Sequence, residues 1–388
     1  MMHDNLALHL DRLTQPAALA EPLAAKPGWV RCFACAHQCK IGPGRRGICQ
    51  VRFNADGILR APYGYVAALQ CDPVEKKPFN HVLPGSQALT FGMLGCDLHC
   101  DYCQNWLTSQ ALRDDRAGAL PQIISAEEIA AAAPRLGAAL VVSSYNEPLI
   151  TSEWAVAVFE AARPRGLRTA FVSNGNATRE VLTFLRPWVD AYKIDLKTMN
   201  ARRYRQLGAV LDHVLDGIRL VVELGFWLEI VTLVIPGFND DPGELRAAAD
   251  FIVSLSPDIP WHVTAFHKDY RMREPDATTV RDLSKAADIG RQAGLRYVYA
   301  GNLPGRLQNW EHTFCPRCQT RLVARRGFYI LEQRLGADGR CPTCGMSIPG
   351  IWNRQGGAGE TVQGAAAWGR GAELAASAAR VSGGAGNL

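Results

Sequence analysis

Residues 88–105 read ALTFGMLGCDLHCDYCQN, an apolar run that ends in a short loop with three cysteines. The run Ala88–Met93 has the length and composition of a buried β-strand. The loop carries Cys96, Cys100 and Cys103, with an aromatic residue directly before the last of them. Most electron-transfer iron–sulfur clusters have four cysteine ligands, so a cubane cluster on three cysteines keeps one iron without a protein ligand. An open metal position is where chemistry takes place.

The CxxxCxxC spacing resembles the signature of the radical S-adenosylmethionine (SAM) enzymes. In that family the open iron binds the amino and carboxylate groups of SAM, and one electron then cleaves the sulfonium to release a 5′-deoxyadenosyl radical. The resemblance implies a 4Fe–4S cluster on Cys96, Cys100 and Cys103, with these cysteines as the catalytic residues. A zinc loop or three buried thiols is the alternative, and the strand context and the downstream motifs disfavour it.

Length and charge limit the classes of function. The 388 residues are enough for one large domain and small modules. The net charge of +5 is small for this length and no lysine or arginine run stands out, so nucleic acid is not expected as a partner. No apolar stretch reaches the roughly 18 residues of a membrane span, and residues 1–20 lack the pattern of a signal peptide. We expect a cytoplasmic protein without a membrane partner.

The twelve cysteines fall into three clusters, with Cys71 alone. The clusters are Cys32, Cys35, Cys39 and Cys49; Cys96, Cys100 and Cys103; and Cys315, Cys318, Cys341 and Cys344. In a cytosolic protein, gaps of two and three residues between cysteines indicate metal sites rather than disulfides.

From Ala88 onward, apolar runs typical of strands alternate with amphipathic segments typical of helices. The predicted strands are Ala88–Met93, Ala139–Ser143, Arg168–Ser173, Ala191–Asp195, Trp227–Val234, His262–Phe266 and Leu295–Ala300. The predicted helices are Ser125–Leu136, Ser152–Arg163, Thr178–Leu185, Asp241–Leu255 and Thr279–Ala293. This alternation predicts a parallel α/β fold. A doubly wound sheet also fits it, but polar residues recur at the strand ends, which favours a partial TIM-like (βα)6 barrel of the radical SAM type.

Composition predicts five parts of the chain. They are an N-terminal helix and linker (1–28), a cysteine-rich module (29–75), the barrel (76–305), a zinc-ribbon-like module (306–353) and a Gly/Ala-rich tail (354–388) that is too poor in large apolar residues to fold.

Polar residues follow the second and third predicted strands. Tyr145-Asn146-Glu147-Pro148 stands where the radical SAM family has Gly-Gly-Glu-Pro, a motif that holds the SAM amino group, but only the last two residues match strictly. A carboxylate suits an ammonium group through charge-assisted hydrogen bonds. Ser173 and Asn174 end the third strand with short polar groups suited to a ribose or a carboxylate.

Asp195 and Lys197 end the fourth predicted strand in a segment similar to the Asp-Leu-Lys of glycyl-radical-enzyme activases, where both side chains lie near the SAM carboxylate. His267 matches a histidine near SAM in the same activases. A strand-end salt bridge and a structural histidine are the plain alternatives. The predicted SAM-binding residues are therefore Asn146, Glu147, Ser173, Asn174, Asp195, Lys197 and His267.

The two outer cysteine clusters predict further metal sites. Cys315-Pro-Arg-Cys318 and Cys341-Pro-Thr-Cys344 form paired knuckles typical of a zinc ribbon, with rubredoxin-type iron as the alternative. Cys32, Cys35, Cys39 and Cys49 suit either a tetrahedral zinc ion or an auxiliary iron–sulfur cluster, and their spacing does not choose between the two.

Four segments together resemble the radical SAM member of the AmmeMemoRadiSam system, a family related to the pyruvate formate-lyase activating enzymes. They are Cys32–Arg52, Val74–Pro78, Leu94–Trp106 and Val298–Asn302, and the resemblance covers about residues 29–350. It implies a radical SAM enzyme with an electron donor such as flavodoxin or ferredoxin, and with a protein substrate or partner proteins of the system as options. The alternatives are an activating enzyme that makes a glycyl radical on a partner protein and, from a different class, a non-catalytic metal-binding interaction or electron-transfer protein.

Overall fold

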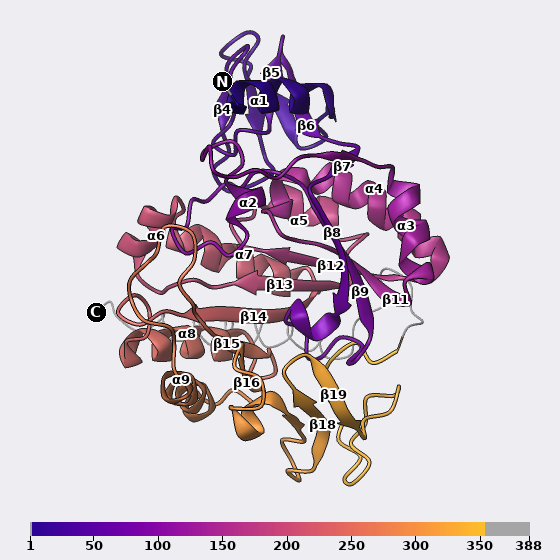
Figure 1. Ribbon diagram of the computed structural model, residues 1–388, viewed down its shortest axis with the longest axis vertical. Coiled ribbons are helices and arrows are strands. Elements are labelled where there is room, and N and C mark those ends of the chain that lie inside the picture. Colours follow the sequence, from indigo (N-terminus) through magenta and orange to yellow (C-terminus); the bar gives the residue numbers. More distant parts are fainter. Residues whose placement is uncertain (1, 354–388) are drawn as a thin grey trace, which may run out of the picture.

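An eight-stranded sheet forms the centre of the computed structural model, which describes residues 2–353 (Figure 1). The predicted tail lies outside the described residues. In sheet order the strands are β16 (Val298–Gly301), β15 (Trp261–Ala265), β14 (Trp227–Val234), β13 (Ala191–Asp195), β12 (Arg168–Ser173), β11 (Ala138–Ser143), β9 (Gln87–Gly92) and β8 (Ala68–Pro73). The pairs from β9 to β16 are parallel, and β8 pairs with β9 in the antiparallel direction.

The parallel strands follow one another across the sheet in the order of the chain, from β9 to β16. A doubly wound sheet reverses its strand order at a switch point, and this sheet does not. Right-handed crossovers that always lead to the next strand place their helices on one face of the sheet. These helices are α3 (Ala126–Arg135), α4 (Ser152–Ala162), α5 (Arg179–Leu185), α6 (Ala201–Leu207), α7 (Leu211–Glu223), α8 (Pro242–Leu255) and α9 (Val280–Ala293). The strand order therefore matches a (βα)6 unit followed by a seventh parallel strand.

The segment that connects β8 and β9, at one edge of the sheet, reaches the strand at the other edge. His81 lies between the paired strands β8 and β9 at one edge, and Tyr299 lies on β16 at the other. The His81 Nε2 atom is 2.7 Å from the Tyr299 hydroxyl oxygen. The prediction of a partial TIM-like barrel, rather than a flat doubly wound sheet, is confirmed.

Capping residues define several of the barrel helices. At α3, Ser125 and Glu128 form a capping box, with both reciprocal hydrogen bonds present. At α8, the Asp241 side chain accepts hydrogen bonds from two backbone N–H groups, and Pro242 occupies the first helical position. Helices α6 and α7 were not assigned from the sequence. Val210 precedes α7 and offers no capping side chain, so the usual start signal is absent.

Smaller elements lie at both ends of the described chain. They are α1 (Met2–Arg12), the sheet of β1 (Thr14–Pro16), β6 (Ile58–Pro62) and β5 (Phe53–Ala55), the sheet of β2 (Ala20–Pro22), β3 (Val30–Cys32) and β4 (Lys40–Ile41), the pair β7 (Tyr65–Val66) and β10 (Gln122–Ile123), and the sheet of β17 (Thr313–Phe314), β18 (Arg321–Arg326) and β19 (Tyr329–Gln333). Strand β8 falls inside the range predicted for the cysteine-rich module but belongs to the central sheet. The domain limits remain predictions.

Within residues 2–353, every helix is too short or too polar to cross a lipid bilayer.

Candidate functional site

A cavity of about 590 Å³ opens at the carboxyl ends of the parallel strands, a size in the usual range for small-molecule sites. All ten residues predicted for the cluster and for SAM line it: Cys96, Cys100, Cys103, Asn146, Glu147, Ser173, Asn174, Asp195, Lys197 and His267. The structure thus brings the predicted residues together in one place, although their roles toward a cofactor remain predictions.

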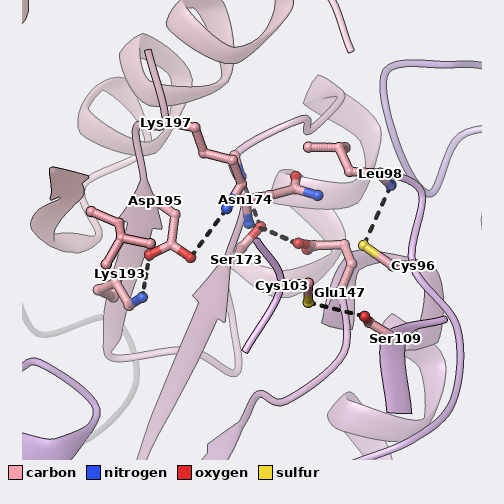
Figure 2. Close-up of polar contacts among 12 residues, drawn as sticks. Cys96, Leu98, Cys103, Ser109, Glu147, Ser173, Asn174, Lys193, Asp195 and Lys197 are labelled. Atoms are coloured by element: carbon pink, nitrogen blue, oxygen red, sulfur yellow. Dashed lines mark hydrogen bonds and ion pairs between the residues drawn. The ribbon is translucent and has the colours of Figure 1, made fainter. Parts of the chain in front are cut away.

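The cysteine loop runs directly from β9 to the short helix α2 (Trp106–Ser109). The Leu98 backbone N–H donates to the Cys96 Sγ atom at 3.3 Å, and the Ser109 hydroxyl lies 3.2 Å from the Cys103 Sγ atom (Figure 2). Burial raises the pKa of the Cys100 thiol to about 12, and it raises the pKa of Cys96 well above its ordinary value. Buried thiols of this kind become thiolates when a metal cation compensates their charge. The donor set therefore fits a cluster, with hydrogen bonds to sulfur that tune its potential.

Glu147 sits beside the cysteine loop, at the centre of a set of polar contacts (Figure 2). Its carboxylate accepts hydrogen bonds from the Ser173 hydroxyl at 2.7 Å, the Asn174 backbone N–H at 2.7 Å and the Leu149 backbone N–H at 3.1 Å (Figure 2). These bonds join the end of β11 to the end of β12. Glu147 therefore orders the loop that carries Ser173 and Asn174, besides facing the cavity.

Asp97 is a buried acidic residue of the site that sequence reasoning missed. Its two carboxylate oxygens accept hydrogen bonds from the side-chain amides of Asn174 at 2.7 Å and Asn176 at 2.8 Å. Burial raises the pKa of Glu147 to about 8, and the charge of Asp97 adds to this rise while the hydrogen-bond donors oppose it. The position of Asp97 inside the cysteine loop was the available signal, but an acidic residue next to a cysteine does not reveal its own burial.

Asp195 lies between two lysines at the end of β13. Lys193 forms a short ion pair with it, and the Lys197 Nζ atom is 3.6 Å from its other oxygen (Figure 2). Burial alone would raise the pKa of Asp195, but the two lysines outweigh burial and hold it below its ordinary value. The strand-end salt bridge given as an alternative for this segment is present between Lys193 and Asp195, and it also keeps a carboxylate charged beside the cavity.

Asn146 and His267 line the cavity, but their side chains form contacts with other parts of the protein. The Asn146 side-chain oxygen accepts a hydrogen bond from the Met93 backbone N–H at 3.0 Å, which fixes the turn after β11. His267 is exposed, with its Nε2 atom 3.1 Å from the Gln104 amide nitrogen.

Lys77 also lines the cavity and was not predicted as a site residue. Its ammonium is buried and lies 3.0 Å from an Asp72 oxygen and 3.1 Å from the Tyr145 hydroxyl.

The outer cysteine clusters differ in their geometry. The Sγ atoms of Cys315, Cys318, Cys341 and Cys344 all lie within 4.8 Å of one another. Of the N-terminal cluster, Cys32, Cys35 and Cys49 are buried and Cys39 is half-buried. Among residues 2–353, the C-terminal four form the sole group of three or more potential ligands at the spacing of a single metal ion.

Comparisons with known proteins agree with this geometry. Residues 91–251 match the family model of the radical SAM superfamily. An uncharacterised protein of Methanocaldococcus jannaschii is 35% identical over 324 residues, which cover 82% of this chain and 95% of that protein. The pyruvate formate-lyase-activating enzyme of Staphylococcus aureus is 25% identical over 236 residues, covering 57% of this chain and 92% of the enzyme.

Among solved structures, a radical SAM methyltransferase from Sphaerobacter thermophilus aligns with a TM-score of 0.45 at 13% identity, over 75% of this chain and 78% of that one. The narrower AmmeMemoRadiSam assignment stays a prediction. The chain belongs to the radical SAM superfamily, and its radical SAM domain is homologous to the pyruvate formate-lyase activating enzymes.

Proposed function

We propose that the protein cleaves SAM reductively in the 590 Å³ cavity and uses the resulting 5′-deoxyadenosyl radical to remove a hydrogen atom from a substrate bound beside it. The observation that carries this proposal is the joint lining of one cavity by a three-cysteine loop and by polar residues from three strand ends. A carrier that only moves electrons has no use for a ligand cavity against its cluster, so this observation disfavours the non-catalytic alternative.

Different residues around the cavity suit the cluster, the ammonium group and the carboxylate of SAM. A 4Fe–4S cluster held by Cys96, Cys100 and Cys103 would supply one electron to the sulfonium of SAM and break its bond to the 5′ carbon, which yields methionine and the radical. Glu147 is placed to attract the SAM ammonium, because its carboxylate faces the cavity and is held by fixed donors. Lys197 supplies a positive charge suited to the SAM carboxylate. Its Nζ atom is 3.6 Å from the nearest Asp195 oxygen, a long ion pair that leaves the ammonium able to bind a second carboxylate.

The test is anaerobic reconstitution with iron and sulfide, reduction in the presence of SAM, and quantification of 5′-deoxyadenosine and methionine. We expect both products in equal amounts from the wild-type protein and none above background from Cys100→Ala. Cys71→Ala is the matched control, because Cys71 lies on β8 outside the cavity lining. Full activity of Cys100→Ala, or inactivity of a wild-type protein that carries its cluster, contradicts the proposal.

The similarity to activating enzymes supports a second candidate, the generation of a glycyl radical on a partner protein. The two candidates share the cleavage of SAM and differ in the fate of the radical. A glycyl radical survives on the partner protein and gives an electron paramagnetic resonance (EPR) signal after the small molecules are removed, whereas a small-molecule product leaves the proteins without that signal. In either case the electron comes from a low-potential donor of the flavodoxin or ferredoxin class.

We also propose that the four C-terminal cysteines bind one zinc ion. The Sγ atoms of Cys315 and Cys344 lie 3.6 Å apart, as do those of Cys318 and Cys341, which suits four sulfurs each about 2.3 Å from one ion. Elemental analysis should find one zinc per chain in the wild-type protein and none in Cys341→Ser. Zinc in the variant at the wild-type ratio, or iron in its place, contradicts this assignment.

A further inference from the structure

The N-terminal cysteines lie directly against the loop of Cys96. A Cβ atom added to Gly95, the residue before Cys96, would be 3.2 Å from the Cys49 carbonyl oxygen and 2.8 Å from the Val51 side chain. Cys49 and Val51 also pack with Ile150, which follows the Glu147 turn. Figure 1 shows the N-terminal segments beside α2, the helix that follows the loop. The two cysteine groups are therefore neighbours in space although far apart in sequence.

Hydrogen bonds hold this contact in place. Arg113 donates from one nitrogen to the Leu98 carbonyl at 2.9 Å, within the loop, and from another to the Ile48 carbonyl at 2.6 Å, next to Cys49. On the other side, the Ala36 backbone N–H donates to the Asn176 carbonyl at 2.8 Å. The Asn176 side chain in turn donates to Asp97. Two hydrogen bonds through Asn176 thus connect Ala36, the residue after Cys35, to Asp97, the residue after Cys96.

A buried arginine lies among the N-terminal cysteines. Arg52 is 1% exposed and forms a buried ion pair with Glu153, while its Nε atom has no hydrogen-bond partner among the described residues. Burial alone would lower the pKa of Arg52, but Glu153 and the neighbouring cysteines Cys32, Cys49 and Cys35 outweigh it. An unpaired N–H beside sulfur ligands is a donor for a sulfide or thiolate, whose negative charge it stabilises.

The sulfur atoms of the N-terminal four do not have the spacing of ligands around a single ion. A multinuclear cluster spreads its ligands over several irons, so their sulfurs stand farther apart than those around one zinc ion. The C-terminal four have single-ion spacing. Within residues 2–353 the N-terminal four do not form such a group, and neither do the three cysteines of the Cys96 loop. The N-terminal cysteines and the cysteines of the Cys96 loop therefore both have sulfur atoms that are too far apart for one shared metal ion.

We propose that Cys32, Cys35, Cys39 and Cys49 bind a second iron–sulfur cluster that relays electrons to the cluster of the Cys96 loop. One electron enters this relay cluster from a low-potential protein donor of the flavodoxin or ferredoxin class and leaves to the cluster of the Cys96 loop, and no bond or proton changes at the relay. The acceptor in this scheme rests on the proposed function. The contact between Gly95 and Cys49 places the two cysteine-bearing segments directly against each other.

Metal content tests the site without any catalytic assay. The triple variant Cys96→Ala, Cys100→Ala, Cys103→Ala, reconstituted anaerobically, should retain about four irons and an EPR signal on reduction, against about eight irons in the wild-type protein. A triple variant with no iron but with one zinc more than the C-terminal site requires overturns the proposal. Either result is independent of SAM cleavage, so the failure of this site and the failure of the proposed function are distinguishable.

The relay itself is tested with Cys39→Ser, which changes the least buried of the four ligands. The rate at which a protein donor reduces the loop cluster, followed by freeze-quench EPR, should fall at least tenfold, while reduction by a small chemical reductant stays within twofold of the wild-type rate. Cys71→Ser is the matched control and should behave as wild type. An unchanged rate with the protein donor in a variant that has lost the second cluster refutes the relay.

Discussion

Glu147 shows how single residues shape this site, because one carboxylate both orders a loop and faces the ligand cavity. It is buried, with Ser173 and Asn174 as its donors, and its pKa lies near 8 because of burial and the charge of Asp97. Half of the Glu147 side chains are therefore protonated near pH 8 in the protein without SAM. A bound ammonium group favours the charged form, so SAM binding is expected to release a proton from this residue below pH 8.

The change Glu147→Gln should weaken SAM binding about 10- to 100-fold, as expected for the loss of a charge-assisted hydrogen bond. In the wild-type protein SAM affinity should rise between pH 6.5 and 8.5, and the variant should lack this part of the rise. Equilibrium dialysis with labelled SAM measures both effects, and the iron content should not change. The exposed carboxylate Glu180, replaced by glutamine, is the control. Equal affinities of Glu147→Gln and wild type would refute the assigned role.

For single residues, the sequence predicted which side chains line the cavity, but it did not predict the hydrogen bonds and ion pairs between them. The cysteine spacing and the strand-end positions were enough to bring ten residues to one cavity, since parallel strands end at the same rim. Asp97 could not be predicted, because its partners Asn174 and Asn176 come from a distant part of the chain. The same holds for Lys77, whose ammonium meets the hydroxyl of Tyr145.

Among the elements, α7 supports the site from behind. Its Gly217 packs on the loop after β12, where a Cβ atom would lie 2.2 Å from the Gly175 carbonyl oxygen. Gly175 itself has a φ of +79°, a conformation that favours glycine. The helix therefore supports the backbone that presents Ser173 and Asn174.

Gly217→Ala should destabilise the protein by about 1–3 kcal/mol, the usual range for overpacking, because a backbone oxygen has no room to move aside. The gain in helix propensity, about 1 kcal/mol, offsets only part of this cost. Anaerobic urea unfolding followed by circular dichroism measures the difference. Gly118→Ala is the matched control, since no atom lies within 4 Å of its added Cβ. If Gly217→Ala has the stability of the wild-type protein, the loop at Gly175 can move aside without cost, and the prediction is wrong.

The elements were largely predictable from apolar runs and caps, and the exceptions have local causes. All seven predicted strands are present, with shifts of a few residues at their ends. Helix α7 has no capping side chain at Val210, so its start carried no signal. Helix α6 does have one, because the Asn200 side chain accepts from two backbone N–H groups, and this cap was the signal that could have revealed it.

At the scale of the whole molecule, a buried network joins the C-terminal module to both edges of the barrel. The Pro349 carbonyl can only accept, so the His81 Nδ1 atom, 2.7 Å away, carries the proton and donates to it. The Nε2 atom then accepts from Tyr299, whose hydroxyl also contacts Thr313 at 2.8 Å. Arg325 completes the connection by donating to Thr313 and to the Asn80 carbonyl. This arrangement is that of the neutral imidazole, the form that burial favours.

Burial lowers the pKa of His81 to about 4, so the unfolded chain binds a proton between pH 6.5 and 4 that the folded protein does not. The stability from this group is present above pH 6.5 and is lost as the pH falls toward 4, by up to about 3 kcal/mol. His81→Gln should therefore show a smaller loss of unfolding free energy between pH 7.5 and 5 than wild type. The exposed His213→Gln is the control. Parallel pH profiles for wild type and His81→Gln would contradict the neutral state.

The arrangement of the modules was beyond the sequence. Cysteine spacing indicated metal sites at both ends, but it did not show that the N-terminal group packs on Gly95 or that the C-terminal module contacts His81. Such contacts depend on surface complementarity between segments that are distant in sequence, Cys49 and Gly95 in the first case and His81 and Pro349 in the second, and no local pattern encodes them.

The most direct test of the central claim is whether SAM binds to the open iron of the Cys96 loop. Electron–nuclear double resonance on the reduced protein, with SAM labelled by ¹⁵N in its amino group, detects that nitrogen if it lies in contact with the cluster. We predict a ¹⁵N coupling in the wild-type protein and its loss in Cys100→Ala. A reduced loop cluster that shows no ¹⁵N coupling while SAM is bound would contradict the account.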